Sequence, residues 1–563
     1  MKKIFLILSV LLAAVACQKP QYVLPTIERQ GITSLTAYFT SGQYEDQQLA
    51  KLTITDPEAD RYVIEVPWFF PEESENPTTI HMASLRIRAE IATNCKIDPP
   101  LTVLDLNLDN QFTFTDAQGK SRNIVITGQR VKSNKTELLS FSLTEPYPVD
   151  GFVDASEGIV YLFTTDDLSN FSADAVVCAH ATISTDISKP KNYNNEQLLT
   201  VGAHDGVTKQ TYKIVKKTPT KIPYGFNSGS ERQLFNFDPV TRLGLPAYSE
   251  TAYPSLGAIG GKLVVCTGSG TPIYLNGMTG VKEGNINLGS AVCNAVTSDE
   301  AGHLLVITHA EAGGTMSIYA TSSVTSAPTL FYQYENATDL PVGYHVKVCG
   351  DIKGSAQIIL THEGVDGVTG SGRYTRLVVS GGAVTDVIEY NVGDNGLLWG
   401  SAPTSAAKVV SAGPSADAGE FFSWYGDNYN LYYRSATGTI VAKDLNTLDP
   451  ITGDNSWGYN FNCMDAKSYN GAYYLTHLVT SHFPNWGFGP LLYLYDAATP
   501  SLIKSASPIS SDTAIEWYQT GNYASAKGDV IISQSADGFR MFVYYYDFHA
   551  QVIGGYTMDC IKK

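Results

Sequence analysis

One short pattern, which we call the kernel, recurs six times in the second half of the chain. Each kernel has apolar residues, then a small polar residue or cysteine, then a variable residue. The six copies are residues 263–267, 305–309, 358–362, 420–424, 473–477 and 530–534. They recur about every 40 to 60 residues, the length of one four-stranded unit with generous loops. A strand and a turn precede most kernels and two strands follow, which predicts a β-propeller over residues 217–563.

The number of blades stays open at this level. The six kernels predict six blades, but residues 231–251 contain one or two further strands that no kernel accounts for. These strands either complete the last blade or belong to a seventh. The sequence therefore predicts a six- or seven-bladed ring.

The kernel is expected to be the second strand of each blade, so all kernels end at one face of the ring. The connections from one blade to the next emerge at the same face. The residues at the kernel ends are Thr267, His309, His362, Trp424, His477 and Gln534. The connections carry Tyr253, Tyr344, Trp399, Trp457, Tyr459, Trp517 and Tyr518, and the loop 478–490 adds His482, Phe483, Trp486 and Phe488.

This collection of side chains suits a sugar ligand. A pyranose offers an apolar C–H face for flat rings and hydroxyl groups for polar side chains. We therefore predict ligand contacts for Trp486, Trp424, Trp457, Trp399, Trp517, Tyr344, His309, His362, His477 and His482. Structural alternatives stay open: propellers wedge aromatic rings between blades, and the repeated Thr-His pairs can bridge neighbouring blades.

Residues 30–133 and 134–216 are expected to form two related Ig-like β-sandwich modules. Short alternating strands, such as 62–66 and 159–163, are separated by polar turns at intervals of about 10 residues. Both modules end in a hairpin with a glycine turn, which favours duplication. His180 and His204 are isolated in the sequence, and we expect each of them to be structural or exposed.

The N-terminus has the pattern of an export signal. Two lysines are followed by the apolar run 4–16 and then by Cys17, with Ala14 where such signals usually carry leucine. Cleavage before Cys17 and lipidation of its thiol would leave a membrane-anchored chain. We assign residues 1–16 to the lipoprotein signal and 17–29 to the lipidated cysteine and tether.

Composition narrows the function classes. The net charge of −17 argues against nucleic acid and against adsorption on anionic lipid. Seven cysteines follow Cys17 at irregular spacing, which favours buried free thiols. His309, His362 and His477 belong to different repeats, so we predict no metal site and no cofactor. The sequence contains no G-x-S-x-G, no H-E-x-x-H and no P-loop motif.

A lipidated N-terminus, tandem Ig-like modules and a C-terminal propeller together resemble the outer-membrane lipoproteins of unknown function from Bacteroidota. That resemblance implies a lipid anchor as the only membrane attachment and a place beside SusC/SusD-type uptake systems that capture glycans. The segment 18–21 has no acidic residue, so the cell surface and the periplasmic face both stay open.

Three functions follow as hypotheses. The first is a non-catalytic protein that binds a glycan or glycoconjugate, with the N-terminal modules as a stalk. The second is a scaffold that binds a polypeptide in an envelope assembly. The third is a glycan-active enzyme, for which Glu311, Glu363 and Asp366 would be the residues to test.

Overall fold

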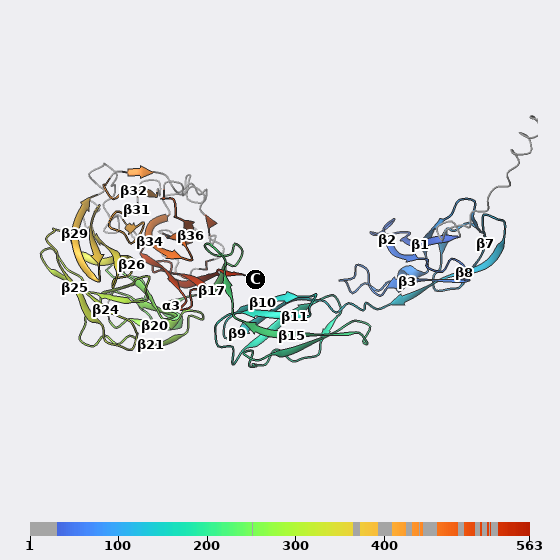
Figure 1. Ribbon diagram of the computed structural model, residues 1–563, viewed down its shortest axis with the longest axis horizontal. Helices are drawn as coiled ribbons and strands as arrows, with labels where there is room; N and C mark the ends of the chain where they lie inside the picture. The colour runs from blue at the N-terminus through green and yellow to red at the C-terminus, as the bar shows by residue number, and fades with distance from the viewer. Residues whose placement is uncertain are drawn as a thin grey trace, which may run out of the picture. The chain divides into compact units, whose positions relative to one another are not determined.

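The protein is nearly all-β and divides into two compact units (Figure 1). Unit 1 contains the chain up to Leu143 with Asp150–Leu162 and Leu168–Lys216, and unit 2 contains the remainder, mainly Lys217–Lys563. The computed structural model describes residues 31–249, 251–268, 270–363, 372–391, 408–423, 431–438, 440–442, 459–481, 489–500, 507–508, 515–516, 518 and 527–562. Its helices in these ranges are short: α2 (Thr79–Met82) and α3 (Pro239–Leu243).

The first module of unit 1 has two four-stranded sheets around one core. One sheet contains β2 (Gln48–Thr53), β1 (Ile32–Phe39), β4 (Leu85–Ile91) and β6 (Val103–Leu104). The other contains β3 (Arg61–Pro67), β8 (Ser121–Val131), β7 (Asn110–Thr115) and β5 (Lys96–Asp98). Alternation sets the inner faces: Tyr62, Ile64 and Val66 of β3 are buried, while the residues between them are more exposed.

The second module is built differently, as one seven-stranded, nearly closed sheet. Its order is β12 (Ser172–Val177), β9 (Leu138–Glu145), β10 (Val149–Asp154), β11 (Ile159–Phe163), β15 (Lys209–Lys217), β14 (Gln197–Gly202) and β13 (Thr182–Ile183). The first module instead contains the parallel pair β3–β8. Similar strand patterns in the sequence therefore lead to different strand pairing in the two modules.

His180 and His204 have structural roles, one of the two alternatives expected from the sequence, although neither is isolated in the fold. Both rings stack on Phe69, with centroids 4.4 and 5.6 Å away, and His180 Nε2 lies 2.8 Å from the carbonyl oxygen of Glu72. The partners come from distant segments of unit 1, which the linear sequence does not bring together.

Unit 2 contains six successive four-stranded antiparallel sheets among its described residues (Figure 1). Sheets one to three are β18 (Ser255–Ile259), β19 (Lys262–Cys266), β20 (Ile273–Asn276), β21 (Lys282–Asn285); β22 (Ala295–Ser298), β23 (Leu304–Ile307), β24 (Thr315–Thr321), β25 (Thr329–Glu335); and β26 (Val342–Gly350), β27 (Ser355–His362), β28 (Arg373–Ser380), β29 (Ala383–Asn391). Sheets four to six are β30 (Lys408–Ser411), β31 (Glu420–Ser423), β32 (Tyr432–Arg434), β33 (Ile440–Ala442); β34 (Tyr459–Tyr469), β35 (Ala472–Ser481), β36 (Leu491–Asp496), β37 (Ser507–Pro508); and β38 (Gly528–Gln534), β39 (Arg540–Asp547), β40 (Val552–Asp559), β17 (Arg232–Phe237).

The six sheets close into a propeller-like ring. Their first strands contact one another in succession, β18 with β22, β22 with β26, β26 with β30, β30 with β34, β34 with β38, and β38 again with β18. The strand β17 pairs with β40 and so supplies the outer strand of the sixth sheet. Residues 231–251 therefore help to complete the ring rather than begin a seventh sheet. The two-stranded pair β16 (Thr220–Lys221) and β41 (Ile561–Lys562) adds a second link between the two ends of unit 2.

Five kernels lie on the second strands β19, β23, β27, β31 and β35, as predicted. The sixth prediction is wrong, because residues 530–534 lie on β38, the innermost strand of its sheet. Inner and second strands are both covered on two faces, so both have continuous apolar runs. The pattern alone does not separate the two positions.

No helix in the described ranges is long and apolar enough to cross a membrane. The described cysteines are free thiols, and all are buried except the half-buried Cys95. Their burial agrees with the expectation that they act as small apolar residues.

Candidate ligand-binding face

The second strands end, and successive sheets are joined, at one side of the ring, which we call the kernel-end face. Here Tyr253, His309 and Tyr344 meet, although they precede β18, follow β23 and begin β26. The ring centroids of Tyr253 and Tyr344 are 4.3 Å apart, and those of His309 and Tyr344 are 3.7 Å apart. The convergence predicted for these side chains is therefore present, and all three remain partly exposed.

The surroundings make this aromatic cluster polar. Lys527 Nζ lies 3.9 Å from the centroid of the Tyr253 ring, a cation–π contact. Burial lowers the pKa of His309 to about 4, so its imidazole is neutral at pH 7. Its buried Nε2 has no hydrogen-bond partner within the described structure. The cluster thus offers flat rings beside a neutral group that can donate or accept a hydrogen bond.

Beneath the cluster, the centre of the ring is filled by buried ion pairs. Lys347 Nζ lies 2.7 Å from Asp529 Oδ1, and Lys408 Nζ lies 3.2 Å from Glu363 Oε1. The free space among these side chains is only about 10 Å³, close to what one water needs. These side chains therefore leave no room among themselves for a ligand larger than water. Glu363, a possible catalytic carboxylate from the sequence, is occupied by the ion pair with Lys408.

A larger cleft lies over the third sheet on the same face. Its volume is about 540 Å³, within the range of small-molecule sites. It is lined by Ala337, Thr338, Asp339, His362, Arg373, Tyr374, Glu389, Tyr390 and Asn391. Of these, only His362 was predicted, because the others lie in the connection before β26 or at the ends of β28 and β29, none of which carries a kernel. An arginine and an asparagine bounding two outer strands are too common a pattern to have identified the cleft.

His362 lies at the edge of this cleft but is 1% exposed. Its Nδ1 is 3.0 Å from Thr338 Oγ1 and its Nε2 is 2.8 Å from Thr375 Oγ1. Burial, and then the charge of Arg373, lower the pKa of His362 to about 4. Its two hydrogen bonds fix the rim of the cleft. Thr375 lies on β28 of the same sheet and Thr338 in the connection that leads into β26, so these bonds do not form the predicted bridge to a neighbouring blade.

His477 does not reach the kernel-end face. It is fully buried, with its ring centroid 6.3 Å from that of Tyr495 and Nε2 3.5 Å from Ser423 Oγ. Burial lowers its pKa to about 3. The predicted ligand contact is wrong for His477, because β35 extends beyond it to Ser481.

Most other predicted contacts lie outside the described residues. They are Trp399, Trp424, Trp457, His482, Trp486 and Trp517, and the same holds for Asp366 and for the lipidation site Cys17.

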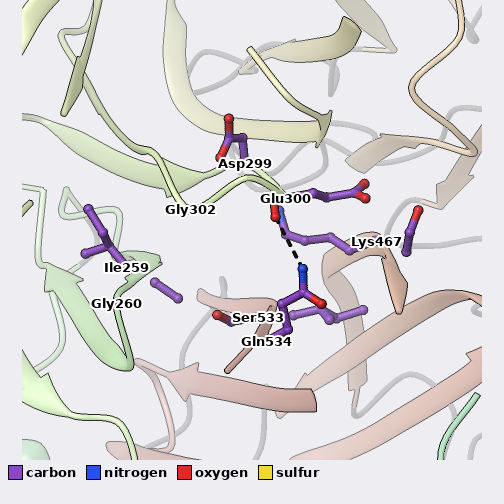
Figure 2. Close-up of a pocket in the computed structure, with 11 residues that line it drawn as sticks. Ile259, Gly260, Asp299, Glu300, Gly302, Lys467, Ser533 and Gln534 are labelled. Carbon is purple, nitrogen blue, oxygen red and sulfur yellow. Dashed lines mark hydrogen bonds between the residues drawn. The ribbon is translucent and has the colours of Figure 1, made fainter. Parts of the chain in front are cut away.

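The opposite end of the ring, which we call the turn face, has a small polar cavity of about 50 Å³ (Figure 2). Gln534 lies here, donating from Nε2 to the carbonyl oxygen of Glu300 over 3.4 Å. Its placement on the kernel-end face was wrong, because it ends an inner strand. Lys467 Nζ donates to the carbonyl oxygens of Ser298 and Val348 over 2.6 and 3.1 Å. This buried ammonium fills part of the space along the ring axis.

Asp299, His303 and Asp351 lie together near the turn face. The Asp299 carboxylate already accepts hydrogen bonds from the backbone amides of Ala301, His303 and Ile352 and lies 2.8 Å from His303 Nδ1. These contacts lock two turns and leave this carboxylate little capacity for a metal ion. We therefore assign the group a structural role.

The ring and its two ends define an all-β protein with a propeller-like C-terminal unit. The chain belongs to the family described as "Domain of unknown function (DUF8500)", whose model matches residues 233–559. Two further models match the N-terminal part, DUF5018 over residues 12–128 and DUF8499 over residues 138–216, both also domains of unknown function. No curated protein matches the chain.

Several solved structures are similar at low identity. A DUF4623 family protein from Bacteroides eggerthii has a TM-score of 0.43 at 15% identity, covering 76% of this chain and 99% of its own. A protein of unknown function from Bacteroides thetaiotaomicron has a TM-score of 0.35 at 13% identity, covering 80% and 95%. An α-L-arabinanase from Penicillium chrysogenum, complexed with arabinobiose, has 0.33 at 13% identity, covering 61% and 99%. Each TM-score is below 0.5, so the closed ring is established by its own strand pairing.

Proposed function

We propose that this chain is a non-catalytic, envelope-anchored protein that captures a glycan or glycoconjugate on the kernel-end face. The observation that carries the proposal is the convergence of Tyr253, His309 and Tyr344 at the centre of that face. Two tyrosine rings can cover the C–H face of a sugar. The imidazole can hydrogen-bond its hydroxyl groups, while the buried Lys527 packs its ammonium against the Tyr253 ring.

The finer architecture forms part of the proposal. We assign the ring as a six-bladed β-propeller and the two N-terminal modules as Ig-like spacers. Cys17 would hold the mature chain to the outer membrane, beside an uptake system that receives the captured glycan. Replacing Cys17 with alanine should move the protein from the membrane to the soluble fraction. Membrane retention of Cys17→Ala would contradict the lipid anchor.

The first test is a screen for glycan capture. The mature chain from residue 18 onward would be run by affinity electrophoresis through a panel of polysaccharides and mucin glycans. We expect retardation by at least one glycan and loss of that retardation in Tyr344→Ala and Trp486→Ala. Tyr332→Ala is a matched control, because Tyr332 is a half-buried tyrosine on β25, away from the cluster. No retardation by any glycan would contradict the proposal.

One observation favours the scaffold as a second candidate. In the second module, Leu139 on β9 and Val176 on the neighbouring β12 are 60% and 52% exposed. Exposed apolar side chains on adjacent strands can form the centre of a protein contact. Capture of one defined protein partner, abolished by Leu139→Ser with Val176→Ser, would support this function.

A further inference from the structure

The cleft over the third sheet and the aromatic cluster lie close together on one face. Thr338 and Asp339 of the cleft directly precede β26, and Tyr344 of the cluster lies near the start of that strand. Val342, between them, pairs with His362 at the cleft. Five residues of extended chain reach at most about 17 Å. The two features are thus within the span of one short oligosaccharide.

The cleft has the chemistry of a saccharide site. The rings of Tyr374 and Tyr390 are stacked with centroids 5.2 Å apart. Arg373, Asp339 and Glu389 add hydrogen-bond donors and acceptors along the lining. Arg373 and Asp339 form an ion pair with each other, so they neutralise one another. Glu389 leaves the lining with one net negative charge, and Tyr390 is the partly exposed ring of the pair, since Tyr374 is 1% exposed. Such a lining suits an uncharged sugar better than an anion.

The tyrosine pair is held rigidly from behind. The Arg434 guanidinium lies 5.1 Å from the Tyr374 ring and 4.7 Å from the Tyr390 ring, and Arg434 is 3% exposed. Such packing fixes the ring orientation before a ligand arrives, which lowers the entropy cost of binding.

One atom beside the cleft lacks a partner. The Tyr374 hydroxyl is buried and makes no hydrogen bond within the described structure. Buried hydroxyl groups are normally satisfied by protein or by ordered water. A water or a sugar hydroxyl in the cleft can supply the missing bond once a lining side chain shifts to uncover this hydroxyl.

We propose that this cleft is a second saccharide subsite, so that the ring binds an oligosaccharide that extends from Tyr344 to Tyr390. The inference rests on the proposed glycan capture and deepens it, because it names an oligosaccharide rather than a single sugar as the ligand. The cluster would hold one part of the glycan and the cleft another.

The test uses the mature chain and fragments of graded length, made by hydrolysis of a panel glycan that retards the wild type. Calorimetric titration should give an affinity at least about tenfold higher for the longer fragments than for the monosaccharide. Tyr390→Ala should abolish this gain with length, whereas Tyr332→Ala, on the corresponding outer strand of the second sheet, should retain it. Circular dichroism of each variant would confirm folding.

A second, milder variant protects the test against misfolding. Tyr374→Phe removes only the unpartnered hydroxyl and should weaken binding of the longer fragments by about three- to tenfold. Tyr193→Phe is its control, because the Tyr193 hydroxyl is also buried and without a partner, but lies in unit 1.

The outcomes separate the two proposals. Failure of the wild type to bind any glycan overturns the proposed function and the second subsite with it. Binding that is lost in Tyr344→Ala but has no dependence on length, or keeps that dependence in Tyr390→Ala, overturns the subsite alone.

Discussion

The imidazole of His309 lies against the ring of Tyr344, with centroids 3.7 Å apart, at the centre of the kernel-end face. Burial lowers the pKa of His309 to about 4, so the imidazole stays neutral over the physiological range. We expect glycan affinity to be constant from pH 8 to about 5.5 and to fall toward pH 4 as the imidazole gains a proton. Calorimetric titrations with the glycan at several pH values between 8 and 4 would measure the change in affinity. In His309→Gln the decrease at acid pH should be absent, and its persistence would assign the decrease to another group.

Acid should destabilise unit 2 through His362. Its pKa is about 4 in the folded protein and about 6.5 in an unfolded chain, so the unfolded state binds the proton first. The contribution to the free energy of unfolding is complete above pH 6.5 and declines as pH falls, by about 3 kcal/mol in the limit. Urea denaturation at pH 7.5 and pH 4 would measure the change. His362→Gln should show a smaller difference between the two pH values, and an equal difference would contradict this explanation.

Glu420 neutralises two buried guanidinium groups between the third and fourth sheets. Its carboxylate lies 2.9 Å from Arg376 Nη1 and 3.5 Å from Arg434 Nε, and all three side chains are at most 3% exposed. Glu420→Ala would leave two buried cations without this anion, and we expect a loss of about 3–5 kcal/mol in unfolding free energy. The control is Glu283→Ala, which breaks the more exposed ion pair with Lys262 and should cost at most about 1 kcal/mol. Equal losses of unfolding free energy in the two variants would show that burial of the Glu420 ion pairs adds nothing to the cost of removing the carboxylate.

Removal of β17 should open the ring. This strand pairs with β40, although it lies at the other end of unit 2, and Phe235 and Phe237 join the core shared by the first and sixth sheets. A chain that begins after Phe237 exposes an unpaired edge on β40, which favours aggregation. Size-exclusion chromatography and hydrogen exchange should detect association and faster exchange in the sixth sheet. A monomer with unchanged protection of β40 would contradict closure by this strand.

Much of the ring could be predicted from the sequence, because buried strands in repeated units have repeated apolar patterns. The five kernels from Leu263 to His477 were assigned to the correct strand. The sixth was not, because an inner strand and a second strand are both covered on two faces. The convergence of His309 and Tyr344 could also be predicted. His309 follows a second strand and Tyr344 lies where one sheet is joined to the next, and both of these positions lie on the kernel-end face.

The cleft could not be predicted. Asp339, Arg373 and Tyr390 come from a connection and two outer strands, and their neighbourhood depends on strand register rather than on local pattern. The ion pairs Lys347–Asp529 and Lys408–Glu363 also join segments that are distant in the chain. Their spacing in the sequence follows no pattern from which either pair could be predicted.

The sequence by itself determined the all-β class, the repeated units of the second half and the meeting of His309 with Tyr344, because the apolar pattern of a strand and its place in a repeat can be read locally. Only the tertiary structure decided how the ring closes, which histidines are exposed and where a cleft forms. Closure by β17 and the burial of His477 depend on contacts between residues far apart in the chain. Such contacts are fixed by the packing of whole sheets and leave no signal in the neighbouring residues.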